Sequence, residues 1–462
     1  MWRATDPLRR IGGRWPKLAR RSNQLAKLVW WTMHGTLFDH VREFRRRRAK
    51  QAAMASTREP RPCSRVELLT ETGVVPGESD PPVDQAWPSD RPLVSVVIPC
   101  FNYGHLVEEA IQSVYEQTFV DLEIIVVEGG STSAESRAEL AAVTRKAASP
   151  RLRVIWQDRP HRAGANRNTG ISHARGKYIC CLDADDRIAP TYIEKAVFVL
   201  EEGYDVVSPA LRFFGKRSEV WAPHERPTLD MLLEGNQVLT CALFRKSLWR
   251  QSGGYRDSDP ATGHLHEDWL FWVRLAALGA RFLNLREPLF HYRSHEGTLS
   301  NSDSVLEHRT QSLEIRRFNS DVLTPEAIAK ARGLIGPAPR PPQAFCQEKR
   351  REVAPSSGPT LLLAMPYLIL GGAERLLSAI VGKLAASGWR VVIVTTVAID
   401  ESHGDTTSWF EGATPEIFHL PRFLEEAYWK DFVDHLFASR RIDLVWVVGS
   451  AFFYDCLPAL RL

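Results

Sequence analysis

Hydrophobic positions between residues 93 and 182 alternate between short continuous runs and amphipathic stretches. Continuous apolar runs are typical of strands buried on both faces, and they lie at 93–98, 122–127, 153–157 and 177–182. Between them, apolar residues recur every three or four positions, which predicts helices over about 106–114, 135–147 and 163–174. This alternation predicts a parallel sheet with helices on both faces. Pro190 is expected to open one more helix, because proline favours the first helical position.

Several residues of chemical interest follow the predicted strands directly. Pro99 ends the first strand, Glu128 follows the second, and Asp183 follows the fourth. Parallel strands share one edge at their carboxyl ends, where such sheets bind ligands. Asp183 and Asp185 add two carboxylates at spacing i, i+2, which suits a divalent cation bridging two phosphates. An Asp-x-Asp triplet alone also occurs in turns and helix caps, but its place on this edge favours a nucleotide diphosphate.

The composition of the chain divides it into five segments. They are a basic amphipathic N-terminal segment (1–54), a Pro-rich linker (55–92), an α/β domain (93–320), a helix with a second Pro-rich linker (321–359), and an incomplete α/β domain (360–462). In the last segment, strands are expected at 360–365, 389–395 and 443–448, with a helix from Gly371 to Gly388.

Cysteine usage and hydropathy indicate the compartment. The seven cysteines form no Cys-x-x-Cys pair and no usual zinc spacing, and Cys180 and Cys181 fall inside a predicted buried strand. This usage suits a reducing compartment. No apolar stretch with a small-residue cleavage site opens the chain, and the longest apolar run, 361–370, contains Pro366 and is too short to span a bilayer. We therefore expect a cytoplasmic protein without transmembrane helices.

The net charge of +4 is distributed unevenly. Residues 1–60 carry 15 Lys and Arg against four Asp and Glu, a net of +11, so the remainder carries 4 − 11 = −7. Residues 25–50 interleave tryptophans and other apolar residues with arginines. Such a helix can lie in the headgroup region of an anionic membrane, peripheral at its cytoplasmic face. A disordered basic tail and non-specific nucleic-acid binding are the alternatives, and no specific nucleic-acid motif accompanies the charge.

Five segments, in this order, resemble the family 2 glycosyltransferases of GT-A fold. They are Ser95-Val96-Val97-Ile98-Pro99-Cys100-Phe101-Asn102, Val127-Glu128-Gly129-Gly130-Ser131-Thr132, Ala165-Asn166-Arg167-Asn168-Thr169-Gly170, Leu182-Asp183-Ala184-Asp185-Asp186 and Glu267-Asp268-Trp269. The resemblance covers about residues 93–305. It implies a Rossmann-like, mostly parallel α/β sheet, a nucleotide-sugar donor (a UDP-sugar above all), and Mg²⁺ or Mn²⁺ as the cofactor.

The resemblance also assigns donor and metal residues. It implies that the base and ribose of the donor are bound by Pro99, Asn102, Glu128 and Asp183, and the pyrophosphate by Arg167. Asp183 and Asp185 would hold the metal, with Asp185 in direct contact, and His295 is a further candidate ligand. For Glu128, Arg167 and His295 the alternatives are a solvated loop residue, a surface ion pair and a structural histidine. The family usually has two aspartates where this chain has Glu128-Gly129.

Glu267 and Asp268 begin a predicted helix, where acidic residues are favoured by the helix dipole. The resemblance implies that Asp268 is the general base. With its carboxylate kept ionised by the dipole, it would take the proton of an acceptor hydroxyl that attacks the anomeric carbon. One such displacement inverts the anomeric centre. Glu267 and Trp269 are expected on the acceptor side, although Trp269 suits the core equally well.

Rival functions differ from this hypothesis in particular features. A processive synthase of the same family would carry Gln-x-x-Arg-Trp and membrane spans, and this chain has neither. We therefore expect transfer of one sugar to a glycan or lipid-linked acceptor in surface polysaccharide biosynthesis. A degenerate nucleotide-sugar-binding scaffold is one alternative, against which Asp183, Asp185 and Asp268 together argue. A nucleotidyltransferase is another, but it would have a Gly-rich basic loop after the first strand.

Residues 360–462 resemble the beginning of a family 4 glycosyltransferase of GT-B fold. The similarity lies in the loop Gly371-Gly372-Ala373-Glu374-Arg375 and its flanking strands. Such enzymes use a second Rossmann-like domain for most donor contacts, and the sequence stops at Leu462 before one could form. This segment is expected to be a truncated second transferase or a non-catalytic remnant.

Overall fold

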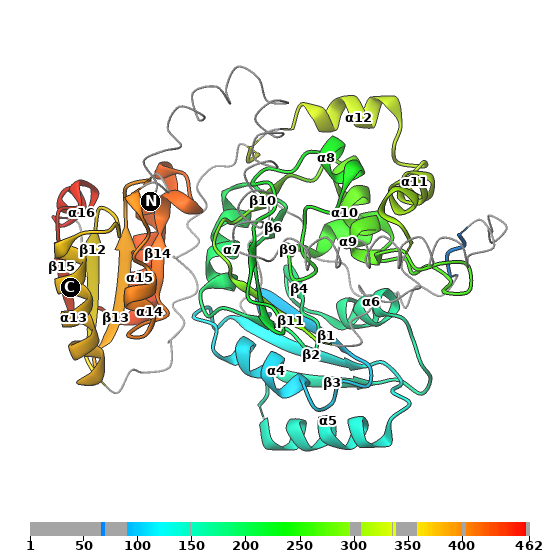
Figure 1. Ribbon diagram of the computed structural model, residues 1–462, viewed down its shortest axis with the longest axis horizontal. Helices are drawn as coiled ribbons and strands as arrows, with labels where there is room; N and C mark the ends of the chain where they lie inside the picture. The colour runs from blue at the N-terminus through cyan, green and yellow to red at the C-terminus, as the bar shows by residue number, and fades with distance from the viewer. Residues whose placement is uncertain are drawn as a thin grey trace, which may run out of the picture. The chain divides into compact units, whose positions relative to one another are not determined.

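A computed structural model of the chain describes residues 66–69, 90–147, 149–295, 306–334, 336–338, 358–399 and 403–458. The basic segment 1–54, with its predicted membrane helix, lies outside the described residues, as do most of the two Pro-rich linkers. Strands are numbered from β1 and helices from α4 (Figure 1).

The first α/β domain contains a seven-stranded sheet. In sheet order its strands are β10 (Phe282–Asn284), β6 (Val206–Ser208), β9 (Leu243–Arg245), β4 (Tyr178–Cys181), β1 (Val94–Cys100), β2 (Leu122–Glu128) and β3 (Leu152–Trp156). Neighbouring strands pair in parallel except at β9, which is antiparallel to β4 and to β6. The mostly parallel sheet predicted from the sequence is thus confirmed, and β9 is an antiparallel strand that the prediction lacked.

Alternating residues of the central strands pack into two separate hydrophobic clusters. On β1, Val96 and Ile98 face one cluster, together with α4 (Val107–Tyr115) and α7 (Tyr192–Glu202). Val97 faces the other, together with α6 (Ala163–His173) and α10 (Glu267–Ala277). Both faces of the sheet are therefore covered by helices, which explains why its central strands β1, β2 and β4 are mostly apolar.

Helix α6 lies close to the sheet because of a glycine. A Cβ at Gly170 would stand 2.3 Å from Val97 Cγ1, so no larger residue fits without moving the helix. The remaining helices of this domain are α5 (Ala134–Ala147), α8 (Leu229–Glu234), α9 (Lys246–Ser252), α11 (His308–Phe318) and α12 (Pro325–Arg332). The close approach of α6 places its first turns beside the carboxyl ends of β1 and β2.

A second, four-stranded sheet lies next to the carboxyl end of β4. Its strands are β5 (Arg187–Ile188), β11 (Phe290–Ser294), β7 (Leu211–Gly215) and β8 (Val220–Trp221). Strand β11 pairs antiparallel with β5, which follows the Asp-x-Asp loop by one residue, and parallel with β7. Because of this pairing, the residue that follows β11, His295, lies beside the Asp-x-Asp loop. The sequence analysis did not anticipate this sheet, because its strands are short and only partly apolar.

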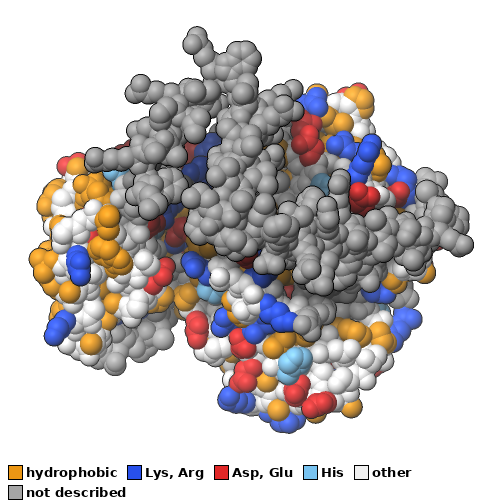
Figure 2. Space-filling model, viewed as in Figure 1, with side chains coloured by type: hydrophobic (Ala, Val, Ile, Leu, Met, Phe, Trp, Pro, Cys, Tyr) orange, Lys and Arg blue, Asp and Glu red, His pale blue; other side chains and the backbone are white. Residues whose placement is uncertain are grey.

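The C-terminal α/β domain is a four-stranded parallel sheet. Its strands, in sheet order, are β14 (Ile417–His419), β13 (Arg390–Thr395), β12 (Thr360–Met365) and β15 (Leu444–Val447). Its helices are α13 (Gly372–Ala386), α14 (Ser408–Glu411), α15 (Trp429–Arg440) and α16 (Ala451–Cys456), with the 3₁₀ turns η3 (Leu420–Arg422) and η4 (Glu426–Tyr428). Most large exposed hydrophobic side chains among the described residues lie in this domain, and they include Leu370, Leu376, Val397 and Trp409. Figure 2 colours hydrophobic side chains orange.

The predicted elements agree with the structure to within one or two residues, except at helix α7. This helix begins at Tyr192 with Thr191 as its N-cap, so Pro190 does not open it. The Pro190 carbonyl instead accepts a hydrogen bond from the Thr118 N–H at 2.8 Å, which connects this turn to the loop before β2. Tertiary contact, not local preference, decides where α7 starts.

Candidate active site

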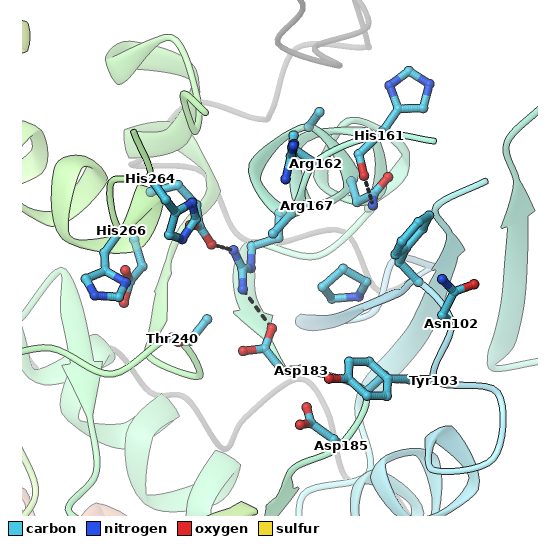
Figure 3. A pocket seen from close by; sticks show the side chains of 18 of the residues that line it. Asn102, Tyr103, His161, Arg162, Arg167, Asp183, Asp185, Thr240, His264 and His266 are labelled. Atoms are coloured by element: carbon cyan, nitrogen blue, oxygen red, sulfur yellow. Dashed lines mark hydrogen bonds and ion pairs between the residues drawn. The ribbon is translucent and has the colours of Figure 1, made fainter. Parts of the chain in front are cut away.

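A cavity of about 890 Å³ lies at the carboxyl ends of β1 and β4. It is lined by seven of the residues predicted from the sequence, namely Pro99, Asn102, Arg167, Asp183, Asp185, Glu267 and Asp268. In Figure 3, Arg167 lies in the middle of this cavity, with Asn102 and Tyr103 on one side and His264 and His266 on the other. Residues separated by more than 160 positions in the chain therefore share one hollow.

The turn after β1 forms the wall of the cavity at Asn102. Asn102 has a positive φ of 60°, a conformation that asparagine tolerates better than most residues. Its backbone N–H donates to Ser131 Oγ at 2.9 Å, and its side-chain oxygen accepts from the Ser133 N–H at 3.0 Å. Asn102 thereby joins the loops that follow β1 and β2.

Asp183 and Asp185 line the cavity directly after β4, at the edge that the sequence analysis predicted. His295 lies next to Asp185, with 2.9 Å between His295 Nε2 and Asp185 Oδ2. His295 is also in edge contact with the ring of Tyr103, 5.8 Å between centroids. Thus β11 and the turn after β1 both bring a side chain to the end of β4.

Three carboxylates, those of Asp183, Asp185 and Asp186, lie at this edge. Burial, together with the charges of Asp185 and Asp183, raises the pKa of Tyr103 to about 12. Burial and the same two carboxylates raise the pKa of Asp186 well above its ordinary value, although its Oδ1 accepts the Arg293 N–H at 2.7 Å. A site of this character favours a cation.

Arg167 connects two carboxylates across the cavity. Its Nη2 donates to Asp183 Oδ1 at 2.7 Å, and its Nη1 donates to Glu267 Oε1 (Figure 3). Burial disfavours the charged guanidinium, but the charges of Asp183 and Glu267 outweigh it and raise the pKa of Arg167 well above its ordinary value. The Arg167 side chain is only 3% exposed, whereas that of Asp183 is 29% exposed. Asp183 is therefore open to a ligand, and Arg167 is largely enclosed by protein.

Glu267 and Asp268 are the first residues of α10 and have opposite shifts in pKa. Burial favours the neutral form of Glu267, but Arg167 outweighs it and lowers the pKa of Glu267. Burial and the charge of Glu267 raise the pKa of Asp268, whose Oδ2 accepts from Asn236 Nδ2 at 3.0 Å. The helix dipole was expected to keep Asp268 ionised; in the structure, desolvation and a neighbouring carboxylate act against it.

Three predicted site residues do not line the cavity: His295, which contacts Asp185 as described above, and Glu128 and Trp269, which are held elsewhere. Glu128 is 1% exposed, and its carboxylate accepts the Ser131 N–H at 2.7 Å and pairs with Arg137 at 3.1 Å. Trp269 is also 1% exposed, and its indole N–H donates to the Leu232 carbonyl at 2.6 Å. Glu128 thus stabilises its own loop, and Trp269 belongs to the core beneath α10. A base contact from the first and acceptor stacking by the second have no support in this geometry.

Several lining residues were not predicted. Phe101 and Tyr103 follow β1, His161 and Arg162 precede α6, and the loop before α10 supplies Pro260, His264 and His266. The sequence analysis did not assign these side chains a role, since histidines in loops carry no spacing signal. Their positions one to seven residues from predicted site residues were the only available clue.

No group of three or more His, Cys, Asp or Glu side chains among the described residues is arranged to hold a metal by itself. Within the same residues, no helix has both the length and the apolar character needed to cross a bilayer.

The fold and this cavity together are those of an enzyme that works at the carboxyl edge of an α/β sheet. The family described as Glycosyl transferase family 2 matches residues 95–258. Glycosyltransferase GlyG of Streptococcus pneumoniae serotype 4 is 26% identical over 246 residues, covering 48% of this chain and 78% of that protein. EpsE of Bacillus subtilis strain 168, named as a glycosyltransferase, is 31% identical over 208 residues, covering 44% of this chain and 73% of that protein.

Among solved structures, residues 1–349 of S. aureus TarS in complex with UDP-GlcNAc are 20% identical, with a TM-score of 0.39, over 49% of this chain and 71% of that one. The sequence matches establish the family of this chain. It belongs to the family 2 glycosyltransferases and is a glycosyltransferase.

Proposed function

We propose that this glycosyltransferase transfers one sugar from a nucleoside-diphosphate sugar to an acceptor hydroxyl, with inversion at the anomeric carbon. The observation that carries the proposal is that Asp268 lines the same cavity as Asp183 and Asp185. Two acidic residues on one wall suit a donor with its cation, and a carboxylate on another wall suits a base. A single displacement needs those two functions on different sides of the reacting carbon.

The donor half of the cavity fits a divalent cation such as Mg²⁺ or Mn²⁺. Asp183 and Asp185 offer oxygen ligands, and His295 offers a nitrogen 2.9 Å from Asp185. A cation of this kind usually keeps waters and takes its remaining ligands from substrate phosphates, so a complete protein cage is not required. When bound, it would neutralise charge on the departing diphosphate.

Asp268 is proposed as the general base. In its ionised form it accepts the acceptor hydroxyl proton as the oxygen attacks. Its raised pKa makes it a stronger base than an ordinary aspartate. Asn236 holds one carboxylate oxygen, which sets the orientation of the other. Arg167 forms an ion pair with Glu267, the neighbour of Asp268, and it holds Asp183 at the donor side. We assign Arg167 this positioning role instead of the pyrophosphate contact inferred from the sequence.

For the donor we propose a UDP-sugar, and for the acceptor a glycan or lipid-linked molecule in surface polysaccharide biosynthesis, as the family resemblance implies. The basic segment 1–54 supports peripheral association with the cytoplasmic face of an anionic membrane. Deleting residues 1–55 should reduce binding to anionic vesicles and leave turnover of a small acceptor unchanged; full-length protein that ignores such vesicles at low salt would exclude this association.

The C-terminal domain is proposed to be one half of a family 4-like glycosyltransferase. Its support is the order of strand β12, the loop at Gly371, and helix α13, within a parallel sheet. The domain has a buried polar group at the carboxyl edge of this sheet, where His419 contacts Thr395 at 2.9 Å and Thr407 at 3.0 Å.

The proposed function is tested with a panel of nucleotide sugars and Mn²⁺. Release of a nucleoside diphosphate, with a sugar added to an acceptor, is the expected result. Transfer of the nucleoside monophosphate, with release of a sugar 1-phosphate, would indicate a nucleotidyltransferase, and a thermal shift without any turnover would indicate a binding or scaffolding protein. The anomeric configuration of the product, determined by NMR, tests inversion separately.

A further inference from the structure

Helix α6 begins without a side-chain cap of its own. Its N-cap residue, Arg162, makes no capping hydrogen bond. The first backbone N–H groups of a helix have no partner within the helix and need one from elsewhere. Here that partner comes from more than 90 positions away. Asp257 Oδ1 accepts the Gly164 N–H at 2.9 Å, and Asp257 Oδ2 accepts the Ala165 N–H at 2.8 Å.

The fit between Asp257 and the helix is close. Asp257 is 7% exposed, and a Cβ at Gly164 would stand 2.8 and 2.9 Å from its two carboxylate oxygens. A residue larger than glycine at position 164 would therefore push the carboxylate away. Burial and the charge of Glu267 raise the pKa of Asp257 to about 6, although the hydrogen bonds from Gly164 and Ala165 and the charge of Arg167 act to lower it. The carboxylate is therefore mostly ionised at neutral pH.

The same contact connects the two halves of the cavity. Arg167 lies on α6, two residues after Ala165, and holds Asp183 on the donor side. In the other direction, Asp257 opens the loop that contains His264 and His266 and ends at α10. This loop is closed at its base by the Leu265 N–H, which donates to Ser258 Oγ at 2.9 Å. One carboxylate thus fixes the helix of Arg167 to the loop that precedes Asp268.

We propose that Asp257 is a positioning residue for glycosyl transfer, which sets the distance between the donor side and the acceptor side of the cavity. The proposal rests on the function proposed above for this site. Asp257 lies outside the cavity lining. It acts through α6 and through residues 258–266, and an error of about 1 Å in such positioning can cost about 10²-fold in rate.

Two substitutions break the contact from opposite sides. Asp257→Asn keeps the shape but presents an amide N–H₂ to one of the two backbone N–H groups, so one hydrogen bond is lost. Gly164→Ala keeps the carboxylate and displaces it. Each should lower kcat by about tenfold or more, at a temperature where the protein is folded, with the KM for the donor changed less than threefold. The double variant should lose no more than the worse single variant, because both act on one contact.

Gly382→Ala is the matched control for the glycine substitution. Gly382 lies inside α13, and a Cβ there meets nothing within 4 Å. This variant should leave kcat unchanged. A kcat per folded molecule within twofold of wild type in both test variants would overturn the proposal and reduce Asp257 to a stabilising cap. If Asp257→Asn does not fold, Gly164→Ala alone decides between the two outcomes.

A measurement without substrate separates this proposal from the proposed function. Amide hydrogen exchange should become faster in Asp257→Asn both at residues 164–168 and at residues 258–266, because the carboxylate holds both segments. Faster exchange in α6 alone would overturn the inference. A wild-type protein that uses no nucleotide sugar would refute the proposed function and leave this exchange result standing.

Discussion

Arg167 Nη2 lies 2.7 Å from Asp183 Oδ1, and the other amino group of the same guanidinium donates to Glu267. One buried cation therefore connects the carboxyl end of β4 with the first residue of α10. The two elements that would hold the donor and the base are positioned by the same side chain. This arrangement, together with the carboxylates on either side, leads to the predictions below.

Replacing Asp268 by Asn should abolish most transfer and spare donor binding. The amide is nearly isosteric with the carboxylate but cannot take the proton of the acceptor hydroxyl. Loss of a general base typically lowers the rate about 10²–10⁴-fold. The measurement is nucleoside-diphosphate release with acceptor present, alongside donor affinity by calorimetry. Asp230→Asn, an exposed aspartate paired with Arg332 at 2.8 Å, is the control. Turnover that Asp268→Asn leaves intact would remove this residue from the role of base.

The activity of the wild-type enzyme should fall on the acid side, and Glu267→Gln should move that fall to lower pH. Burial and Glu267 raise the pKa of Asp268. The base is active when ionised, so kcat/KM declines as pH decreases through this raised pKa. Removing the charge of Glu267 lowers the pKa of Asp268. Glu135→Gln, an exposed glutamate in the first turn of α5, should not change the profile. An acid limb that stays in place, or moves upward, in Glu267→Gln would contradict the assignment.

Substitution of Asp185 by Asn should remove the dependence of donor binding on Mn²⁺. The change takes one negative charge from a group of carboxylates whose potential favours a cation, while the carboxamide keeps the contact size with His295. The check is calorimetric titration of a nucleoside diphosphate with and without Mn²⁺, for wild type and variant. Equal affinity and turnover in the two proteins would exclude the metal site at this edge.

Arg167→Lys tests whether Arg167 positions residues or binds the donor pyrophosphate. Lysine is a single point charge and cannot serve Asp183 and Glu267 through a planar fork. We expect kcat to fall about 10- to 100-fold with little change in donor affinity, because Arg167 is only 3% exposed. A large loss of donor affinity with kcat retained would instead support the direct contact inferred from the sequence. Arg175→Lys, at a half-exposed site paired with Glu123, is the control.

Glu123→Ala should destabilise the fold without altering the chemistry. The Glu123 carboxylate is 2% exposed, accepts from Ser95 Oγ and from the Arg175 N–H, each at 2.7 Å, and pairs with Arg153. It lies at the opposite end of β2 from the cavity. Removing it should cost about 1–3 kcal/mol, measured by urea unfolding. Its kcat at 20 to 25 °C should match wild type, in contrast to Asp257→Asn, and a clear loss of kcat would show coupling across the sheet.

The local sequence was sufficient for strands β1 to β4 of the large sheet and for its ligand-binding edge, but not for β6, β9 and β10. Short continuous apolar runs are typical of buried strands, and apolar residues that recur every three or four positions are typical of helices. The carboxyl edge then followed from the parallel connection of the strands, and with it the positions of Asp183 and Asp185. The small sheet of β5, β11, β7 and β8 could not be predicted in this way, because strands of two to five residues that are half exposed have no continuous apolar run.

The sequence by itself determined which residue types lie at the ends of the strands and at the start of α10; the tertiary structure decided which of them share the cavity. Glu128 and Trp269 are close in sequence to residues that line the cavity. Glu128, however, is held in its own loop by Ser131 and Arg137, and the side chain of Trp269 lies on the core side of α10. Asp257 had no signal at all, since a lone aspartate in a loop is common. Its role arises only because folding brings its carboxylate to two backbone N–H groups that have no partner within their own helix.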